Sequence, residues 1–508
     1  MTPWAVFFVA NWFVNCRKLF CAFYLRQKNY RVIEIYFKDY VHHNFKPPTE
    51  REIELLIQTL HRENADIIGL SVRAGGYYRM ASELTRILKA DFDVPVIWGG
   101  MHVTMDPENS LASCDGVMIG ESEATICELM EALENSRPLT EIKGLWYKDK
   151  DNRIIRNPLR PLLENLDDLP FRDFHSHEYK YSIDGNTVKR GDPYSDQTGY
   201  LMMSARGCLF NCAYCDVSAL RKVYAGLGKF YRACSPQRVI EECLYAKKQF
   251  PKLRRFRFDD ELFCMNDGYL EEFCRLYQEK VRLPFEILTD PRVVRAERLQ
   301  KLKQAGLDTI MMGIQNIGRI NSKYYNRHVG DEQVIAAAEA IHKVNIKPCY
   351  QILLDDPHVG EDDNRELFEL LLKLPRPFDL YLFSLSYWPR TDITERYIAD
   401  GSIRPEDVEG HNDKCLKQFR VDLTWPRDKN RTFWYSLYTL LSKPVPLCIV
   451  KAIAESRWLR AHPEPVRMLA QLLNFLKLAE LAWQMLIRGE LTWNTIKRWV
   501  NLDSLAIS

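Results

Sequence analysis

The sequence predicts an α/β protein with a doubly wound parallel sheet, then a partial (β/α)6 barrel, then a helical C-terminal domain. Two successive alternations of apolar runs with helical periods predict the first two parts, and a change of composition after Ile403 predicts the third. With 508 residues, the chain is too long for one ordinary core. We place the first domain at 1–135, a linker with a small hairpin at 136–197, the barrel at 198–403 and the C-terminal domain at 404–508.

The composition is that of a globular protein, with 46% hydrophobic and 27% charged residues. The net charge of +2 gives no large basic field, so we expect no nucleic-acid partner. The N-terminal run WAVFFVANWFV is apolar but too short to span a bilayer, and it lacks the features of a signal peptide. The 14 cysteines are scattered and form no secreted framework. We therefore expect a cytoplasmic protein without a membrane span.

Five apolar runs alternate with helical periods in the first domain. The runs are Trp4–Ala10, Arg31–Tyr36, Asp66–Ser71, Val94–Gly99 and Gly116–Ile119. Helical periods such as Glu50–Glu63 and Tyr78–Ala90 lie between them. This alternation predicts a parallel sheet with helices on both faces, in which ligands bind outside the carboxyl ends of the strands.

Candidate binding residues follow three of these runs. They are Ser71 at the end of the third run, Gly99 and Gly100 at the end of the fourth and just after it, and Gly120 and Glu121 after the fifth. Glycine lets a bulky planar ligand approach the backbone closely, although ordinary tight turns also use it. The domain resembles the flavodoxin-like cobalamin-binding domain, and the resemblance implies that these five residues bind cobalamin.

One departure from that family concerns the lower ligand of the cobalt. The methionine-synthase type carries Asp-x-His-x-x-Gly after its first strand, whereas residues 11–16 read NWFVNC here, with neither Asp nor His. His42 and His43 follow the second run, and we interpret them as exposed loop residues. The resemblance then implies cobalamin without a protein histidine beneath the metal. A first domain that binds no cofactor is the alternative.

The second domain repeats a strand–helix unit. Its apolar runs are Tyr200–Ser204, Arg255–Phe258, Phe285–Thr289, Thr309–Ile314, Pro348–Leu354 and Leu380–Tyr387. Its helical periods are Pro236–Gln249, Asp267–Lys280, Ala296–Ala305, Asp331–Val344 and Asp362–Leu374. Ser235 and Pro236 form a good helix start, and Gly306 a good helix end. Parallel strands in such a repeat form a partial barrel whose site lies at their carboxyl ends.

Three cysteines, Cys208, Cys212 and Cys215, lie close together in the run SARGCLFNCAYC. A structural zinc site would want four ligands, and only one Cys-x2-Cys pair is present. A disulfide interpretation fails on the odd count and on the reducing compartment. Iron–sulfur clusters are normally held by four thiolates, so three on one loop would leave one iron open to substrate.

The run resembles the motif of the radical S-adenosylmethionine (SAM) superfamily, with Tyr214 as its aromatic residue. The resemblance implies a [4Fe–4S] cluster held by the three cysteines, with SAM chelating the fourth iron and cleaved to a 5′-deoxyadenosyl radical. It also implies that Tyr214, Asp259 and Asp260 lie at SAM. Gln315 stands near the SAM ribose, where many members carry Glu, and Arg327 also matches the family pattern.

The C-terminal domain shows helical periods at Leu447–Leu459 and Val466–Ile487, with several tryptophans. One interpretation is the core packing of a small helical domain. The other is a cap over the barrel mouth that shapes a pocket for a hydrophobic substrate.

The whole arrangement resembles the cobalamin-binding radical SAM family over about the first four hundred residues. The resemblance implies radical chemistry on an unactivated carbon of a small, hydrophobic substrate, with methyl transfer in biosynthesis favoured, and an electron donor such as flavodoxin or ferredoxin. One alternative is a radical rearrangement or oxidative cyclisation without methyl transfer. Another is an iron–sulfur electron-transfer or sensor protein, whose cluster would be closed by a fourth thiolate such as Cys234 or Cys264.

Overall fold

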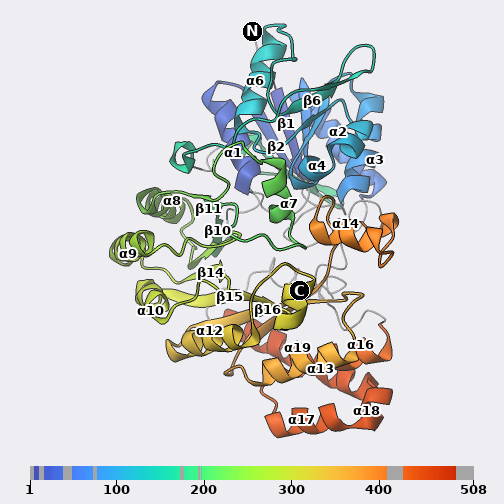
Figure 1. The fold of residues 1–508 in the computed structure, drawn as a ribbon. Coiled ribbons are helices and arrows are strands. Elements are labelled where there is room, and N and C mark those ends of the chain that lie inside the picture. Colours follow the sequence, from blue (N-terminus) through green and yellow to red (C-terminus); the bar gives the residue numbers. More distant parts are fainter. Residues whose placement is uncertain are drawn as a thin grey trace.

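The computed structural model of the chain describes residues 5–10, 16–37, 48–72, 77–171, 177–192, 195, 197–408 and 427–487. A nine-stranded sheet with its helices occupies one end of the molecule, and the C-terminal helices occupy the other (Figure 1). A six-stranded sheet lies between them, with a layer of helices along its outer face.

The parallel centre of the nine-stranded sheet consists of the five strands predicted for the first domain. They are β1 (Ala5–Ala10), β2 (Arg31–Phe37), β3 (Ile67–Ser71), β4 (Val96–Gly99) and β5 (Gly116–Met118). Their order is β2-β1-β3-β4-β5, and every neighbouring pair is parallel. This is the flavodoxin-like order, so the predicted fold of this part is confirmed.

Helices cover this sheet, and two of them, α2 and α3, lie where the sequence predicted helical periods. The covering helices are α1 (Cys16–Gln27), α2 (Glu50–Glu63), α3 (Tyr78–Asp91), α4 (Met101–Met105), α5 (Pro107–Ser113) and α6 (Glu123–Glu134). Helix α2 begins with a capping box, in which Glu52 N–H donates to Thr49 Oγ1 at 3.2 Å and Thr49 N–H donates to Glu52 Oε2 at 2.7 Å. The cap fixes where the helix starts, as its sequence indicated.

Residues 136–197, which we expected to form a linker with a small hairpin, extend the first sheet at both edges. Strands β6 (Leu145–Lys148) and β7 (Ile154–Arg156) form an antiparallel hairpin that pairs with β5. Strands β8 (Lys180–Asp184) and β9 (Thr187–Arg190) form a second hairpin, in which β8 pairs with β2. The segment is therefore part of the first domain's sheet, not only a connector.

The second sheet is an open run of six parallel strands in the order β10-β13-β14-β15-β16-β17. Each overlaps one of the predicted runs, and two have the predicted bounds: β10 (Gly199–Met202), β13 (Arg255–Phe258), β14 (Phe285–Thr289), β15 (Leu307–Gln315), β16 (Lys347–Leu354) and β17 (Asp379–Ser384). The predicted partial barrel is confirmed.

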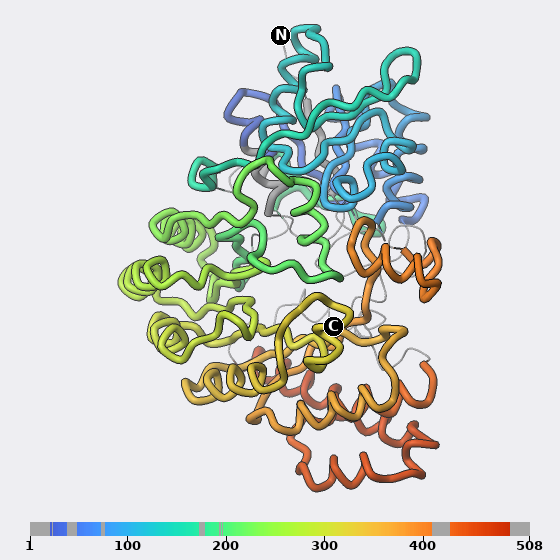
Figure 2. Tube along the Cα trace, in the orientation of Figure 1, coloured from blue at the N-terminus to red at the C-terminus, as the bar shows by residue number. Residues whose placement is uncertain are grey.

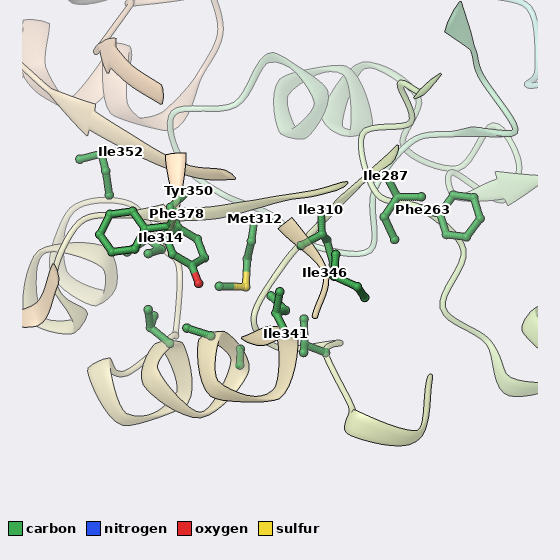
Figure 3. Packing of buried hydrophobic residues seen from close by; sticks show 14 of the residues in the cluster. Phe263, Ile287, Ile310, Met312, Ile314, Ile341, Ile346, Tyr350, Ile352 and Phe378 are labelled. Carbon is green, nitrogen blue, oxygen red and sulfur yellow. The ribbon is translucent and has the colours of Figure 1, made fainter. Parts of the chain in front are cut away.

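The helices that follow these strands pack on one face of the sheet. They are α8 (Pro236–Gln249), α9 (Asp267–Leu276) with a π turn at Tyr277–Val281, α10 (Ala296–Ala305), α12 (Asp331–Lys343) and α13 (Glu361–Leu372). Figure 3 shows Met312 of β15 and Tyr350 of β16 between the sheet and Ile341 of α12. Burying these side chains holds the strands at fixed positions beneath the barrel mouth.

The C-terminal helices continue the barrel's core instead of forming a separate one. They are α16 (Lys429–Leu441), α17 (Leu447–Glu455), α18 (Arg457–Ala461) and α19 (Glu464–Ile487), and α14 (Asp392–Ala399) comes before them at the end of the barrel domain. Phe433, Trp434 and Leu437 of α16 are buried in the same apolar cluster as the barrel strands. The described tail helices therefore pack on the barrel's core, and they do not form the separate core expected of a small helical domain.

Two residues of the C-terminal segment also reach the barrel mouth at Asp355, which follows β16. Tyr435 Oη lies 3.0 Å from Asp355 Oδ1, and Arg427 Nη2 donates to Asp355 Oδ2 at 3.1 Å. Helix α14 lies beside the first domain in Figure 2, and Arg390 just before it pairs with Glu108 of α5 at 3.4 Å. Within the described ranges, no helix is both long and apolar enough to span a bilayer.

Lys180 and Asp192 form a buried ion pair near the β8–β9 hairpin, with Nζ and Oδ2 at 2.9 Å and side-chain exposures of 0% and 2%. We expect Asp192→Ala to lower the free energy of unfolding by roughly 3–5 kcal/mol, because it removes a partner of a buried ammonium group. Chemical denaturation followed by circular dichroism measures this. The control is Glu54→Gln in the exposed pair with Arg51, which should cost less than about 1 kcal/mol. An equal loss of unfolding free energy in Asp192→Ala and Glu54→Gln would show that burial of the Lys180–Asp192 pair does not raise its contribution.

Candidate active site

The three cysteines of the SAM-type run lie on the loop between β11 (Ala205–Arg206) and α7 (Asp216–Val223). Cys212 is buried, and Cys208 and Cys215 are half-buried. The loop follows β10, the first barrel strand, so it lies at the carboxyl ends of the six parallel strands. This is the edge at which such sheets bind their ligands.

Distant segments hold the backbone of this loop. Ala213 N–H donates to the carbonyl of Tyr325 at 2.7 Å, and Ala213 O accepts from Ile393 N–H in α14 at 3.0 Å. Asn326 Nδ2 donates to the carbonyl of Asn211 at 2.9 Å. Since these partners come from the stretch after β15 and from α14, the folded barrel helps to fix the loop.

The donor set of the loop fits an iron–sulfur cluster. Burial raises the pKa of Cys208 to about 11 and that of Cys215 well above its ordinary value, so the free thiols are neutral and a bound metal is needed to make them thiolates. In the described part of the chain, no three His, Cys, Asp or Glu side chains lie close enough together to hold a single metal ion. A four-iron cluster does not need this, because each iron takes a separate thiolate.

Two arginines stand beside Cys212. Arg292 Nη2 lies 3.9 Å and Arg327 Nη1 4.0 Å from Cys212 Sγ. Asp290 holds both, at 2.7 Å from Arg292 Nε and 2.7 Å from Arg327 Nη1. Burial alone would raise the pKa of Asp290, but the hydrogen bond from Arg292 and the charge of Arg327 outweigh it and lower the pKa. The ionised carboxylate leaves a net positive charge beside Cys212, which suits a thiolate-bound cluster.

Asp260 holds the turn that leads into the cluster loop. Its Oδ1 accepts from the N–H groups of Ser204 and Ala205 at 2.6 and 2.8 Å, and its Oδ2 accepts from Ser204 Oγ at 2.6 Å. Burial raises the pKa of Asp260 to about 8, despite these hydrogen bonds. We expected Asp260 to contact SAM, but its oxygens already have three internal donors. The neighbouring Asp259 is half-exposed, pairs with Arg257 at 3.1 Å, and stays the candidate for that contact.

Gln315 ends β15 in a left-handed backbone conformation, with φ at 68°. Non-glycine residues rarely adopt this conformation, and it often marks functional positions. The register of β15 against β16 also shifts between Gly313 and Gln315. Tyr214 packs edge-on against Tyr325, with ring centroids 5.3 Å apart. Tyr214 and Gln315 thus lie at the barrel mouth, as predicted, and their contacts with SAM stay predictions.

Three of the predicted cobalamin residues lie together at the carboxyl edge of the first sheet. Ser71 and Gly99 are register partners on β3 and β4. Gly100 has φ at 117°, and a Cβ there would lie 2.5 Å from Val72 O, so only glycine lets α4 start this close to β3. Residues 11–15, His42 and His43 lie outside the described residues, so cobalt binding without a histidine ligand stays a prediction.

Gly120 and Glu121, the other two predicted cobalamin residues, face the barrel domain. A Cβ on Gly120 would lie 1.8 Å from Tyr224 Oη. Glu121 forms ion pairs with Arg206 and Arg232. Position 120 does require glycine, but the close neighbour that requires it is the side chain of Tyr224. Sequence reasoning noted Arg206 and Gly207 as typical of the family's local sequence before Cys208, but it missed Arg232, Tyr224 and the contact of Arg206 with Glu121.

Two family models match the chain in the order of its domains. The B12 binding domain matches residues 18–130, and the radical SAM superfamily matches residues 202–371. The chain therefore contains a B12 binding domain followed by a radical SAM domain. Its cobalamin-binding architecture is confirmed as well, and the cofactors of this architecture are a [4Fe–4S] cluster, SAM and cobalamin.

Curated relatives of this radical SAM protein include two methyltransferases and a cyclase. An uncharacterised methyltransferase of Pyrococcus horikoshii is 27% identical over 354 residues, which are 68% of this chain and 72% of that protein. Bacteriochlorophyllide d C-8(2)-methyltransferase of Chlorobaculum tepidum is 25% identical, over 72% of this chain and 76% of its own. Anaerobic magnesium-protoporphyrin IX monomethyl ester cyclase of Synechocystis is 22% identical, over 54% of this chain and 53% of its own.

Two solved structures share the fold of this radical SAM protein over most of their lengths. The radical SAM methyltransferase TsrM of Kitasatospora setae has a TM-score of 0.62 at 13% identity, covering 92% of this chain and 99% of its own. The cobalamin-dependent SAM radical enzyme OxsB has a TM-score of 0.63 at 16% identity, covering 99% of this chain and 84% of its own.

Asp260 gives a prediction about cluster binding. Asp260→Asn should keep near wild-type iron content after anaerobic reconstitution, because the amide oxygen accepts both backbone N–H groups and the amide nitrogen donates to Ser204 Oγ. Asp260→Ala should lose most of the iron, since the turn before Cys208 loses its anchor. Iron analysis and absorbance near the thiolate–iron bands measure both. Equal iron content in the two variants would contradict this role.

The raised pKa of Asp260 gives a prediction about pH. The unfolded chain ionises this carboxyl near pH 4 and the folded chain near pH 8, so the neutral acid stabilises the fold below this range. This contribution should fall as the pH rises from about 4 to about 8, by at most roughly 1.4 kcal/mol per pH unit. Denaturation across that range, compared between wild type and Asp260→Asn, measures it. An Asn variant with the wild-type pH dependence would assign the effect to another group.

Proposed function

We propose that the protein is a cobalamin-dependent radical SAM methyltransferase, which transfers a methyl group to an unactivated carbon of a small molecule in biosynthesis. The observation that carries this proposal is the contact between α4 and α7. Helix α4 begins directly after Gly100 in the predicted cobalamin turn, and α7 begins directly after Cys215 in the cluster loop. Both loops therefore lie at one boundary between the two sheets.

An apolar cluster closes this boundary. Met105 of α4 packs with Leu220 and Tyr224 at α7, and with Leu162 of the segment that joins the domains. Because these side chains are buried, they exclude water between the helices. A fixed separation of two cofactor sites favours the direct passage of a group from one to the other, since it removes the cost of bringing them together.

When bound, the cluster with SAM supplies an electron and a carbon-centred radical, and cobalamin supplies a methyl carrier. The residues of this chain bind and orient these groups. Arg292 and Arg327 place positive charge beside Cys212. Asp259 offers a half-exposed carboxylate to an amino group, and the half-buried ring of Tyr214 lies at the end of the cluster loop.

For the substrate we propose a small, largely apolar molecule. The methyltransferase of Chlorobaculum tepidum, which is named for a bacteriochlorophyllide, supports this class. The C-terminal helices support it as well, because α16 extends the barrel's apolar core. Tyr435 of α16 also reaches the barrel mouth, where its hydroxyl donates to Asp355. The proposal includes a cytoplasmic location and a small protein electron donor, such as flavodoxin or ferredoxin.

A radical rearrangement or oxidative cyclisation is the second candidate, and Gln315 favours it. The amide keeps an acceptor at this position but lacks the charge of the glutamate that many family members carry. The 22% identity with the Synechocystis cyclase supports the same alternative. In that case SAM would yield 5′-deoxyadenosine without giving up its methyl group.

The products of SAM separate these candidates. We expect the protein, reconstituted anaerobically with iron, sulfide and hydroxocobalamin, to form about one equivalent of S-adenosylhomocysteine per bound corrinoid when reductant and methyl-deuterated SAM are added. The label should appear in the corrinoid fraction by mass spectrometry. 5′-Deoxyadenosine without S-adenosylhomocysteine would favour cyclisation, and no consumption of SAM would favour an electron-transfer protein.

Cys212→Ala tests the cluster in the same assay. It should abolish formation of 5′-deoxyadenosine, because one iron loses its thiolate. The matched control is Cys448→Ala, which removes an exposed cysteine from α17 and should leave both products unchanged. Unchanged 5′-deoxyadenosine in the Cys212 variant would sink the assignment of the cluster ligands.

A further inference from the structure

The segment Gly120-Glu121-Ser122-Glu123 of the first domain, here called the 120–123 segment, contacts both flanks of the cluster loop. We propose that this segment positions the cluster loop relative to the first domain, with Arg206, Arg232 and Tyr224 as its partners in the barrel domain. The inference rests on the proposed function, because it gives the segment the task of aligning the two cofactor sites.

The front flank of the loop is held through Arg206, two residues before Cys208. Arg206 Nη2 donates to Glu123 Oε1 at 2.6 Å, and Nη1 lies 3.1 Å from Glu121 Oε1. The arginine side chain is only 4% exposed. The charged hydrogen bond to Glu123, with the ion pair to Glu121, fixes the direction of the planar guanidinium, and so the place where the loop begins.

Arg232 strengthens this contact from the opposite strand. Strand β12 (Arg232–Ala233) pairs antiparallel with β11, and Arg206 and Arg232 are register partners. Two like charges at such positions repel each other. Glu121 lies between them, because its carboxylate accepts from Arg232 Nη1 at 3.0 Å and from Arg232 Nη2 at 2.7 Å. The two-stranded ribbon therefore needs the carboxylate of the other domain.

The rear flank of the loop is held through Tyr224, the residue that caps α7. Its hydroxyl accepts from Glu121 N–H at 2.7 Å. The same hydroxyl packs on Gly120, whose φ of 81° and missing Cβ leave the space for it. Helix α7 starts one residue after Cys215, so this contact fixes the end of the loop as Arg206 fixes its start.

The positive and negative charges of this contact are equal in number, and the four charged side chains are almost fully buried. Two guanidinium groups face two carboxylates, and the side chains of Glu121 and Glu123 are 10% and 11% exposed. Removing one member leaves an uncompensated buried charge, so the contact should open as a unit and not gradually. Loss of a carboxylate from the 120–123 segment should then alter the conformation of the cluster loop that carries Cys208, Cys212 and Cys215.

Hydrogen exchange measures this coupling without turnover. We expect Glu123→Gln, in the full chain with its cluster reconstituted, to raise the exchange rate of peptides that span residues 205–216 by at least fivefold. The matched control is Glu128→Gln on the same helix, which removes a partner of Arg160 and should leave these peptides unchanged. Unchanged exchange in the Glu123 variant would overturn the proposal.

Tyr224→Phe covers the case in which Glu123→Gln fails to fold. It removes the bond to Glu121 N–H without burying a charge, and it should raise the exchange of residues 212–224 more than that of the front flank. The double variant Glu123→Gln/Arg206→Met should exchange no faster than Arg206→Met alone, because both changes break one contact. Additive effects would contradict a shared contact.

Product ratios then connect the contact to the reaction. In Tyr224→Phe and Arg206→Lys, methyl transfer per 5′-deoxyadenosine should fall at least tenfold while iron and corrinoid contents stay at wild-type levels. Altered exchange with an unchanged ratio would mean that the contact is only structural and would overturn the positioning role. If wild-type protein transfers no methyl group at all, the proposed function fails, whereas the exchange result still decides the coupling.

Discussion

Parallel pairing of the strands is the constraint on which the site depends. In both sheets the central strands run in one direction, so every strand delivers its following loop to the same edge. The cysteine loop after β10, the left-handed turns at Gln315 and Asp355, and the Ser71 and Gly99 pair all lie at such edges. A chain of antiparallel hairpins would have spread the same residues over opposite ends of the protein.

Charge compensation is the second organising feature of the site. A cluster held by three thiolates concentrates negative charge in a poorly solvated place, and Arg292 and Arg327 offset it at Cys212. Asp290 keeps both arginines in place and is ionised itself, so the excess positive charge is limited to about one unit. Asp260 acts differently, because it is buried without a cation in hydrogen-bond contact and holds the backbone as an acceptor.

The strands could be predicted from the sequence for physical reasons, and the candidate metal ligands could be proposed from it. An apolar side chain at every second position packs on the core, as in the sequences RFRF and FEILT, so Arg255–Phe258 and Phe285–Thr289 were predicted with their observed bounds. The three cysteines carry their spacing in the sequence itself. The hairpins at β6–β7 and β8–β9 were underestimated, because short strands at a sheet edge are partly exposed and show weaker patterns.

The roles of single carboxylates could not be predicted in this way. Asp260 and Glu121 both follow strand ends, where a carboxylate can face a ligand or another segment of the chain. Which one it faces depends on packing between segments far apart in sequence, such as Glu121 with Arg206 and Arg232. The residue type and position were informative, but the partner was determined by the tertiary fold.

The two edge hairpins have a consequence for how this protein can be divided. The chain leaves β5 to build β6 and β7 on one edge, then crosses to the far edge to build β8 and β9 before entering β10. On the way, Leu162 and Leu166 are buried in apolar clusters with residues of the barrel domain. A cut near residue 135 would strip both edges of the first sheet. Recombination could therefore not exchange the cobalamin-type domain by itself at residues 18 and 130, where the B12 binding domain match begins and ends. Any viable chimaera would have to include the crossing segment as well.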